Sequence, residues 1–313
     1  MAILLAVTGW PTQPWLDRFR QHGDEFEWVS ADAAYDPADI EHAVVWKPRP
    51  GLLAGLPRLR TIFNLGAGID ALVADRGLPD VPLVRIVDPD LTARMTEYVT
   101  FNVLRCHRRE WEHRAAQAER RWISPEQPAA AEVRVGIMGL GTLGRDAAEV
   151  LARLGFRVAG WSRSAKAVAG IEGFAGEAGL DAFLARTDIL VVLLPLTGET
   201  RGILNRRLFA GLARDGRLGG PYLINAGRGG LQVEADILAA LDDGTLAGAV
   251  VDVFETEPLP PESPMWSHPK LIVSPHNAAD SDPDAVSRNV VAQLRRLARG
   301  EALEHVVDRA TGY

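Results

Sequence analysis

The sequence predicts an α/β protein built from two doubly wound parallel sheets. Short apolar runs alternate with longer amphipathic stretches along the whole chain, which is typical of parallel strands covered by helices on both faces. The chain has 313 residues, enough for two domains with sizeable cores. A glycine-rich turn also follows one apolar run directly, at residues 139–144.

Composition and charge exclude several classes of partner. The chain is 47% hydrophobic and 24% charged, with a net charge of −7 and no dense Lys/Arg block, so nucleic acid is not expected to bind. The apolar run Ala2–Val7 has no preceding cationic region and is too short to span a membrane. The single cysteine, Cys106, excludes an intrachain disulfide and any multi-cysteine metal site. We expect a cytoplasmic protein with a buried Cys106 and no metal.

The first series of predicted strands is long enough for one doubly wound sheet. These strands are Ile3–Thr8, Phe26–Ser30, Ala43–Trp46, Thr61–Leu65 and Leu83–Val87. A long helical pattern follows over Leu91–Arg108, and then the charged segment Arg109–Trp122. The proline-containing loop Ser124–Pro128 is expected to lead into the second domain.

A second series of predicted strands begins at Val133. Its members are Val133–Met138, Arg157–Trp161, Ile189–Leu194, Tyr222–Asn225, Gly248–Val253 and Leu271–Val273. A final helix, Asp284–Arg299, is expected to cross back onto the first domain. The prediction is therefore one domain of residues 1–101 and 282–313, with a second domain of residues 102–281 inserted in it.

The turn Gly139-Leu140-Gly141-Thr142-Leu143-Gly144 joins a predicted strand to a helical run, Arg145–Arg153. In that context G-x-G-x-x-G indicates a Rossmann dinucleotide site. The first glycine permits the tight turn, the second lets the backbone approach a pyrophosphate, and the third allows close helix packing. The alternative is a set of ordinary turn glycines.

The end of the next strand indicates which nicotinamide cofactor is bound. A carboxylate there would hold the 2′-hydroxyl of NAD and repel a 2′-phosphate, but this chain has Ser162, Arg163 and Ser164. Arg163 can pair with the phosphate, and the two hydroxyls can donate to it. We therefore expect NADP to be preferred, with NAD as the alternative; a solvated surface arginine is the other interpretation of Arg163.

Three further segments place reactive side chains where strands of the second series end. Asn225-Ala226-Gly227-Arg228-Gly229-Gly230 carries a guanidinium between glycines. Asp252-Val253-Phe254-Glu255-Thr256-Glu257-Pro258 carries carboxylates, and Ser274-Pro275-His276-Asn277-Ala278-Ala279 carries a histidine suited to proton exchange. Each could by itself be a surface or structural residue.

Together and in this order, the four motifs resemble those of the D-isomer-specific 2-hydroxyacid dehydrogenase family. The resemblance extends to Gly66-Ala67-Gly68-Ile69-Asp70 and Met95-Thr96-Glu97-Tyr98 and so covers nearly the whole chain. The segments Trp161–Ser164 and Pro258–Trp266 resemble most the glyoxylate and hydroxypyruvate reductase A branch. The implied fold is a Rossmann domain inserted in a flavodoxin-like substrate domain, and the implied activity is NADPH-dependent reduction of a small 2-keto acid.

The resemblance also implies roles for three catalytic residues. Arg228 would bind the substrate carboxylate and polarise the keto oxygen. His276 would be the general acid and base, and Glu257 would orient its imidazole.

Further contacts are implied for each ligand. Cofactor contacts are expected from Gly139, Gly141, Thr142, Leu143, Gly144, Ser162, Arg163, Ser164, Leu194, Pro195, Ala226 and Asp252. Substrate contacts are expected from Trp46, Ala67, Gly68, Ile69, Arg228 and His276. Lys47 and Trp266 are further candidates for lining the substrate pocket, with core packing as the alternative for the aromatic residues. Asn277 departs from the small or apolar residue that many relatives carry.

By the same resemblance, Arg108–Trp122 is a candidate dimer arm, and a homodimer is expected; a solvated helix is the alternative. Two other functions compete with the reductase. One is a protein of this fold that senses nicotinamide redox state without turnover. The other is a different D-2-hydroxyacid dehydrogenase, acting for example on a phosphorylated serine precursor or on formate.

Overall fold

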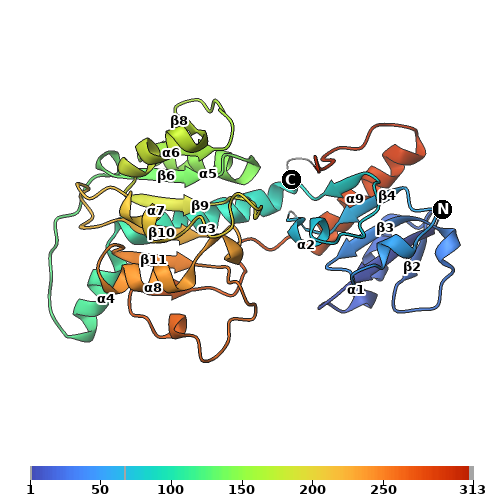
Figure 1. Ribbon diagram of the computed structural model, residues 1–313, viewed down its shortest axis with the longest axis horizontal. Coiled ribbons are helices and arrows are strands. Elements are labelled where there is room, and N and C mark those ends of the chain that lie inside the picture. The colour runs from blue at the N-terminus through green and yellow to red at the C-terminus, as the bar shows by residue number, and fades with distance from the viewer. Residues whose placement is uncertain (1, 67, 310–313) are drawn as a thin grey trace. The chain divides into compact units, whose positions relative to one another are not determined.

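The computed structural model describes residues 2–66 and 68–309, which form two compact units (Figure 1). Unit 1 combines the described residues up to Leu91 with those from Ser281 onward, and unit 2 is Thr92–Asp280. The first boundary, predicted from sequence after residue 101, lies after Leu91, within the first turn of the long helix.

Unit 1 contains a five-stranded parallel sheet in the order β2-β1-β3-β4-β5, which is the flavodoxin-like order. Its strands are β1 (Ala2–Val7), β2 (Glu27–Ser30), β3 (Ile40–Trp46), β4 (Thr61–Asn64) and β5 (Leu83–Arg85). Its helices are α1 (Thr12–His22), α2 (Asp70–Val73) and α9 (Pro283–Ala298), with 3-10 turns η1 (Pro37–Asp39) and η2 (Leu53–Gly55).

The last helix packs on the first sheet, as predicted. Val290 and Leu294 of α9 join Phe19 of α1 and Ile3 of β1 in one buried cluster. The helix begins where it does because Asp282 accepts hydrogen bonds from the first backbone N–H groups and a proline follows it. The opposite face of the sheet is covered by the segment around η2 and by α2.

Unit 2 contains a seven-stranded parallel sheet in the order β12-β11-β10-β9-β6-β7-β8. Its strands are β6 (Arg134–Met138), β7 (Arg157–Ser162), β8 (Glu172–Ala175), β9 (Ile189–Val192), β10 (Tyr222–Asn225), β11 (Gly248–Val251) and β12 (Leu271–Val273). Strand order reverses between β6 and β9, as in a Rossmann sheet. The predicted fold class is confirmed.

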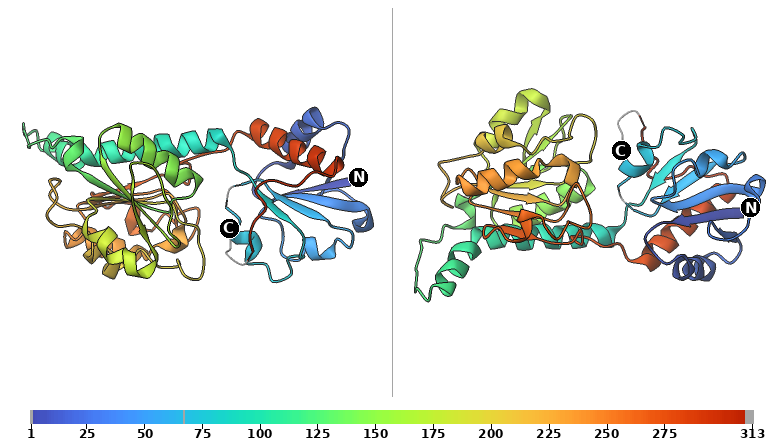
Figure 2. Two further views of the ribbon diagram at one scale, coloured as in Figure 1. Left: turned by 90° about the horizontal axis from the view of Figure 1, so that it is seen from above. Right: turned by 60° about the horizontal axis from the view of Figure 1, so that its bottom comes forward.

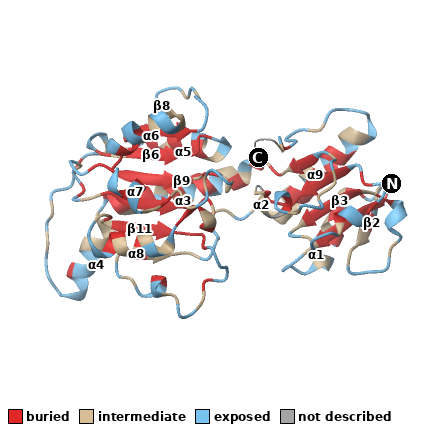
Figure 3. Cartoon of the chain, in the orientation of Figure 1, coloured by how far each residue is buried: buried red, intermediate tan, exposed pale blue. Residues whose placement is uncertain are grey.

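Helices cover both faces of the second sheet (Figure 2). Helices α3 (Pro89–His107) and α5 (Thr142–Arg153) pack on one face; α6 (Gly176–Ala185), α7 (Arg206–Ala210) and α8 (Glu234–Asp242) pack on the other. The remaining elements are α4 (Glu110–Ala118), η3 (Ala130–Glu132), η4 (Gly229–Leu231) and η5 (Pro264–Trp266). The strands of both units are largely buried (Figure 3), and Cys106 is fully buried, as predicted.

One strand was missed from sequence. Strand β8 lies at the sheet edge with exposed and half-buried residues, so Glu172-Gly173-Phe174-Ala175 shows no apolar run. Among the described residues, no helix is long and apolar enough to cross a membrane.

Candidate active site

The three glycines of the turn after β6 differ in whether a Cβ atom could be accommodated at their position. At Gly139, with φ +108°, a Cβ would lie 2.7 Å from the Leu193 carbonyl oxygen. At Gly144 it would lie 1.9 Å from the Gly139 carbonyl oxygen, so helix α5 can pack on the turn only without a side chain. At Gly141 a Cβ would meet no protein atom within 4 Å. The first and third glycines are therefore required by the fold, whereas the second keeps open space above the turn.

That open space lies at a helix N-terminus suited to a phosphate. Gly141 is the N-cap residue of α5, no described side chain caps the helix, and its first turn contains no acidic residue. The turn is placed where the strand order reverses, between β6 and β9, which is where open α/β sheets bind ligands. These features fit the pyrophosphate of a dinucleotide.

The segment after β7 presents cations and no carboxylate. Arg163 and Ser164 are exposed, but Ser162 is buried and its hydroxyl donates to the Ser164 carbonyl oxygen at 2.8 Å, so that hydrogen is used within the turn. Lys166, which sequence reasoning missed, donates from Nζ to the Leu140 carbonyl oxygen at 3.2 Å. Lys166 is therefore a second cation of this segment, and it lies against the glycine turn.

The Arg228 loop is held in shape by its neighbours. Gly227 donates to Asn225 Oδ1 at 3.1 Å, and Asn225 in turn donates to Gln232 Oε1 at 2.8 Å. A Cβ on Gly229 would lie 1.9 Å from the Phe254 carbonyl, so the loop packs tightly on the segment after β11. Arg228 has extended backbone and is half-buried, with Nη1 donating to the Gly227 carbonyl oxygen at 2.7 Å.

The histidine and glutamate predicted from different segments are in direct contact. His276 Nδ1 lies 2.8 and 3.0 Å from the two carboxylate oxygens of Glu257. Because an ionised carboxylate only accepts hydrogen bonds, Nδ1 carries the hydrogen, and Nε2 is the nitrogen left for proton exchange. Glu257 is itself held by the Phe254 N–H, which donates to Oε1 at 3.1 Å. The His276 side chain remains 44% exposed.

Asp252 anchors the histidine loop from below. Its side chain is 1% exposed, and burial raises the pKa of its carboxyl group. Oδ1 accepts from Ser274 Oγ at 2.6 Å and from the Asn277 N–H at 3.1 Å, while Oδ2 accepts from the Ala278 N–H at 3.0 Å. Asp252 was predicted to contact the cofactor. The hydrogen bonds that its carboxylate makes in this structure are with the histidine loop.

Arg228, Asp252 and His276 share one edge of the second sheet. They follow β10, β11 and β12, respectively. These strands are adjacent and parallel, so the carboxyl ends of the three strands lie side by side. Leu194 follows β9 and is 7% exposed, and Pro195 accepts a hydrogen bond from Thr200 Oγ1 at 2.7 Å. Ala226 is buried. The residues predicted in unit 2 thus gather at the edge where Rossmann sheets bind their ligands.

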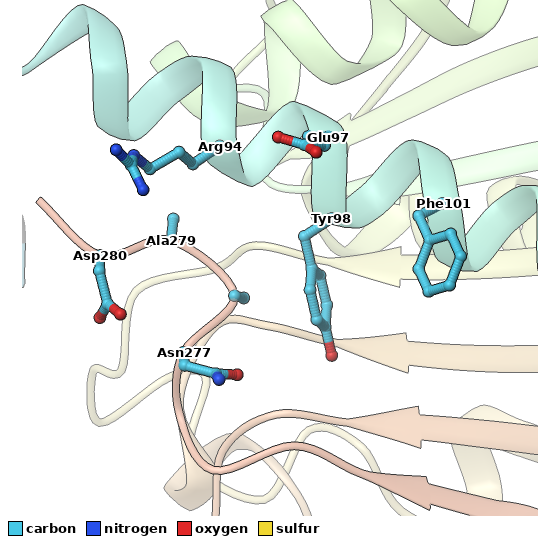
Figure 4. Close-up of a pocket in the computed structure, with 8 residues that line it drawn as sticks. Arg94, Glu97, Tyr98, Phe101, Asn277, Ala279 and Asp280 are labelled. Carbon is cyan, nitrogen blue, oxygen red and sulfur yellow. The ribbon is translucent and has the colours of Figure 1, made fainter.

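A hollow of about 310 Å³ adjoins the histidine loop (Figure 4). It lies between α3, which contributes Arg94, Tyr98 and Phe101, and the segment containing Asn277 and Asp280. Asn277, the residue that departs from the family pattern, therefore lines this hollow. Trp266 lies elsewhere, on η5, where it is 51% exposed and donates to the Pro260 carbonyl oxygen at 3.0 Å.

In unit 1 the predicted substrate residue Trp46, at the end of β3, belongs to a stack of aromatic rings. Trp46 stacks on Trp10 with ring centroids 4.8 Å apart and planes 4° from parallel. The Trp46 ring covers Gly66, where a Cβ would lie 2.3 Å from it. Lys47 Nζ lies 5.5 Å from the Trp46 ring centroid.

The glycine loop of unit 1 is held by a residue that sequence reasoning missed. Asn64, 2% exposed, donates from Nδ2 to the carbonyl oxygens of both Gly66 and Gly68 at 2.8 Å. Ile69 is buried and precedes α2, and Ala67 lies outside the described residues. An asparagine at a strand end before a G-x-G turn is the signal that could have identified this anchor.

The fold and site define a class of protein: a doubly wound dinucleotide-binding protein whose second sheet presents an arginine and a histidine–carboxylate pair. Residues 100–278 match the NAD binding domain of the D-isomer specific 2-hydroxyacid dehydrogenases. The chain belongs to the D-isomer specific 2-hydroxyacid dehydrogenase family, which confirms the resemblance noted from sequence.

Individual relatives cover 90% or more of the chain. Glyoxylate/hydroxypyruvate reductase A of Serratia proteamaculans is 41% identical over 90% of this chain and 91% of that protein. A crystal structure of an NADPH-dependent glyoxylate/hydroxypyruvate reductase from Sinorhizobium meliloti, with NADP and sulfate, is 47% identical with a TM-score of 0.94 and covers 100% of this chain and 99% of that one. A probable 2-hydroxyacid dehydrogenase from Rhizobium etli, solved with NADP, HEPES and L(+)-tartaric acid, is 44% identical, has a TM-score of 0.94, and covers 100% and 99% of the two chains.

Proposed function

We propose that this protein reduces a small 2-keto acid, glyoxylate or hydroxypyruvate, to glycolate or D-glycerate at the expense of NADPH. The observation that carries the proposal is the contact of His276 Nδ1 with both carboxylate oxygens of Glu257, at the edge of the sheet that also carries Arg228. The relatives from Serratia proteamaculans and Sinorhizobium meliloti, which carry this activity in their names, support the choice of substrate.

The site residues divide the reaction between charge and proton. The Arg228 guanidinium binds the substrate carboxylate and stabilises negative charge on the keto oxygen. When bound, the reduced nicotinamide supplies a hydride to the keto carbon. His276 gives the proton from Nε2 to the keto oxygen, so that the C=O becomes CH–OH, and Glu257 balances the charge of the imidazolium before that transfer. Oxidation runs the same steps in reverse.

The residues that would hold the cofactor follow the same sheet edge. Gly139, Gly141 and Gly144, with Thr142 and Leu143 at the start of α5, accommodate the pyrophosphate. Arg163 and Ser164, with Lys166 beside the glycine turn, present donors for a 2′-phosphate where NAD enzymes carry a carboxylate. The relatives from Sinorhizobium meliloti and Rhizobium etli solved with NADP support this preference.

A turnover screen tests the proposal. Purified protein is mixed with glyoxylate, hydroxypyruvate, pyruvate and 2-ketobutyrate, each with NADPH and with NADH, and absorbance of the reduced cofactor is followed. We expect the highest kcat/KM for glyoxylate or hydroxypyruvate with NADPH. Tight NADPH binding without turnover of any substrate would instead support the nicotinamide-sensing alternative, and preference for another keto acid would support a different dehydrogenase of the family.

The remaining assignments complete the proposal. Unit 1 is the substrate domain, in which Trp46, Gly68 and Ile69 contact the substrate, and unit 2 is the dinucleotide domain. The protein is a cytoplasmic homodimer that uses the segment 108–122 as an arm. The 98% exposed Trp122 in this arm and the 56% exposed Phe101 on α3 support a partner surface. Light scattering after size-exclusion chromatography tests the dimer, and fractionation of the source cells tests the location.

A further inference from the structure

A chain of three polar side chains links helix α3 to the histidine loop. Tyr98 Oη lies 2.8 Å from Ser274 Oγ, and Ser274 Oγ lies 2.6 Å from Asp252 Oδ1. Tyr98 extends from α3 toward this loop (Figure 4). All three groups belong to unit 2, and Asp252 is almost completely buried. None of the roles described above uses Tyr98 or Ser274.

The chemistry of the groups determines the direction of this chain. An ionised carboxylate only accepts, so the single hydrogen of Ser274 is donated to Asp252. The serine oxygen therefore accepts from Tyr98, whose hydrogen completes the chain. Burial raises the pKa of the tyrosine hydroxyl, which keeps it a donor. The Tyr98 hydroxyl therefore donates to Ser274 Oγ, and the Ser274 hydroxyl donates to the Asp252 carboxylate.

The end of this chain holds the catalytic loop. The Asp252 carboxylate accepts from the N–H groups of Asn277 and Ala278, and the Asp252 carbonyl oxygen accepts from the His276 N–H at 2.8 Å. Together these bonds hold three consecutive residues, of which His276 has φ +54°, in the left-handed region that non-glycine residues seldom occupy. The imidazole meets Glu257 from this backbone conformation.

Helix α3 is in turn anchored to the helix of the glycine turn. Thr96 Oγ1 donates to Asp146 Oδ2 on α5 at 2.5 Å, two residues before Tyr98. Tyr98 is therefore supported on an element that packs on the same sheet face as α5. The Tyr98 hydroxyl therefore reaches the histidine loop from a helix that is held by α5 and by the sheet.

We propose that Tyr98 and Ser274 are positioning residues: they orient the Asp252 carboxylate, which holds the backbone of residues 276–278 so that the His276 imidazole meets Glu257. Part of the test rests on the proposed reductase activity, because that part measures turnover. The other part measures the loop directly and needs no turnover.

The test compares four variants. Tyr98→Phe removes the first hydroxyl, Ser274→Ala breaks the chain, and Ser274→Thr keeps a hydroxyl at the same position. Tyr222→Phe is the control, because Tyr222 is a buried tyrosine that packs against the same core but lies at the start of β10, at the other end of the strands, where its ring packs on Trp111. Amide hydrogen exchange is followed in peptides covering residues 274–280 and, for comparison, β6.

The expected result is local and graded. In Ser274→Ala, exchange at Asn277 and Ala278 should accelerate roughly 10-fold or more, with β6 unchanged. Tyr98→Phe should accelerate it roughly 2- to 10-fold, and Ser274→Thr should resemble the wild type. With NADPH and the best keto acid, kcat should fall in the same order, while the dissociation constant of NADPH and the KM should change little.

Three outcomes would overturn the positioning role. They are unchanged exchange at residues 276–278 in both Tyr98→Phe and Ser274→Ala, equal acceleration in β6, or a control variant that behaves like Tyr98→Phe. Failure of the proposed function is distinguishable, since a protein that reduces no keto acid would still show the local exchange pattern.

Discussion

The two sheets of this protein carry different residues at the carboxyl ends of their strands. In unit 2 the carboxyl ends of the strands lead into Arg228, buried Asp252 and the Glu257–His276 pair. In unit 1 they lead into the stacked Trp10 and Trp46 rings and a glycine loop. Both sheets are parallel and doubly wound, so the backbone architecture supplies only the place for a site. The residues after the strands therefore decide that the strand ends of unit 2 carry charged side chains and those of unit 1 carry aromatic rings and glycines.

Two histidines show the same contrast. His276 is 44% exposed and pairs with a carboxylate. His42 lies in the middle of the first sheet, 3% exposed, and its Nδ1 has no hydrogen-bond partner among the described residues. Burial lowers the pKa of His42 to about 4. The His276 imidazole is partly exposed beside a carboxylate, whereas the His42 imidazole is enclosed in a core where burial favours its neutral form.

The largest effect is expected at the proposed catalytic histidine. Replacing His276 by Gln should lower kcat roughly 100- to 10,000-fold, because the proton donor is lost while the loop backbone is kept. NADPH binding, measured by fluorescence titration, should stay close to that of the wild type. Full turnover in this variant would remove His276 from the mechanism and leave the Glu257 contact without a catalytic role.

The next effect concerns the cation after β7. Arg163→Asp should lower the ratio of kcat/KM with NADPH to that with NADH by roughly 10- to 100-fold, because a charged contact to the 2′-phosphate becomes a repulsion. Steady-state kinetics with both cofactors measure the ratio. Lys166→Met tests whether the lysine beside the glycine turn shares the task, and Arg157→Asp, on an exposed residue at the other end of β7, is a control.

A pair of glycine variants separates folding from binding in unit 2. Gly144→Ala places a methyl 1.9 Å from a backbone oxygen, so the free energy of unfolding should fall by about 1–3 kcal/mol. Gly141→Ala meets no protein atom within 4 Å, so stability should change by less than about 0.5 kcal/mol. Both should weaken NADPH binding. Urea denaturation and cofactor titration of each variant make the comparison, and equal destabilisation by the two would contradict it.

A further effect is the acid sensitivity of unit 1. His42 has a folded pKa of about 4, below its usual value near 6.5, so the unfolded chain takes up the proton first as the pH falls. The contribution of neutral His42 to the free energy of unfolding is fully present above pH 6.5 and is lost between about pH 6.5 and 4. The total loss is up to about 3 kcal/mol. Urea denaturation at pH 7.5 and pH 5 should show this loss in the wild type and a smaller one in His42→Leu. The exposed His113→Leu should behave like the wild type.

Local patterns were sufficient for most of the strands, the glycine turn and the order of the reactive residues. The strand series was predicted because buried parallel strands read as apolar runs; β8 was missed because an edge strand needs no such run. Arg228, Glu257 and His276 lie in short motifs after predicted strands, and the family resemblance of those motifs together implied their roles. The contact between Glu257 and His276 is consistent with their predicted partnership, although their catalytic roles remain proposals.

The sequence by itself determined the two doubly wound sheets, the position of the glycine turn and the residues at the strand ends, because hydrophobic periodicity and glycine spacing are local properties. Only the tertiary structure decided that Lys166 lies on the Leu140 carbonyl oxygen and that Tyr98 reaches Ser274, 176 positions later. Such contacts depend on how helices and loops pack across a sheet, which no local pattern specifies. Contacts between residues so far apart in the sequence are therefore defined only by the folded structure.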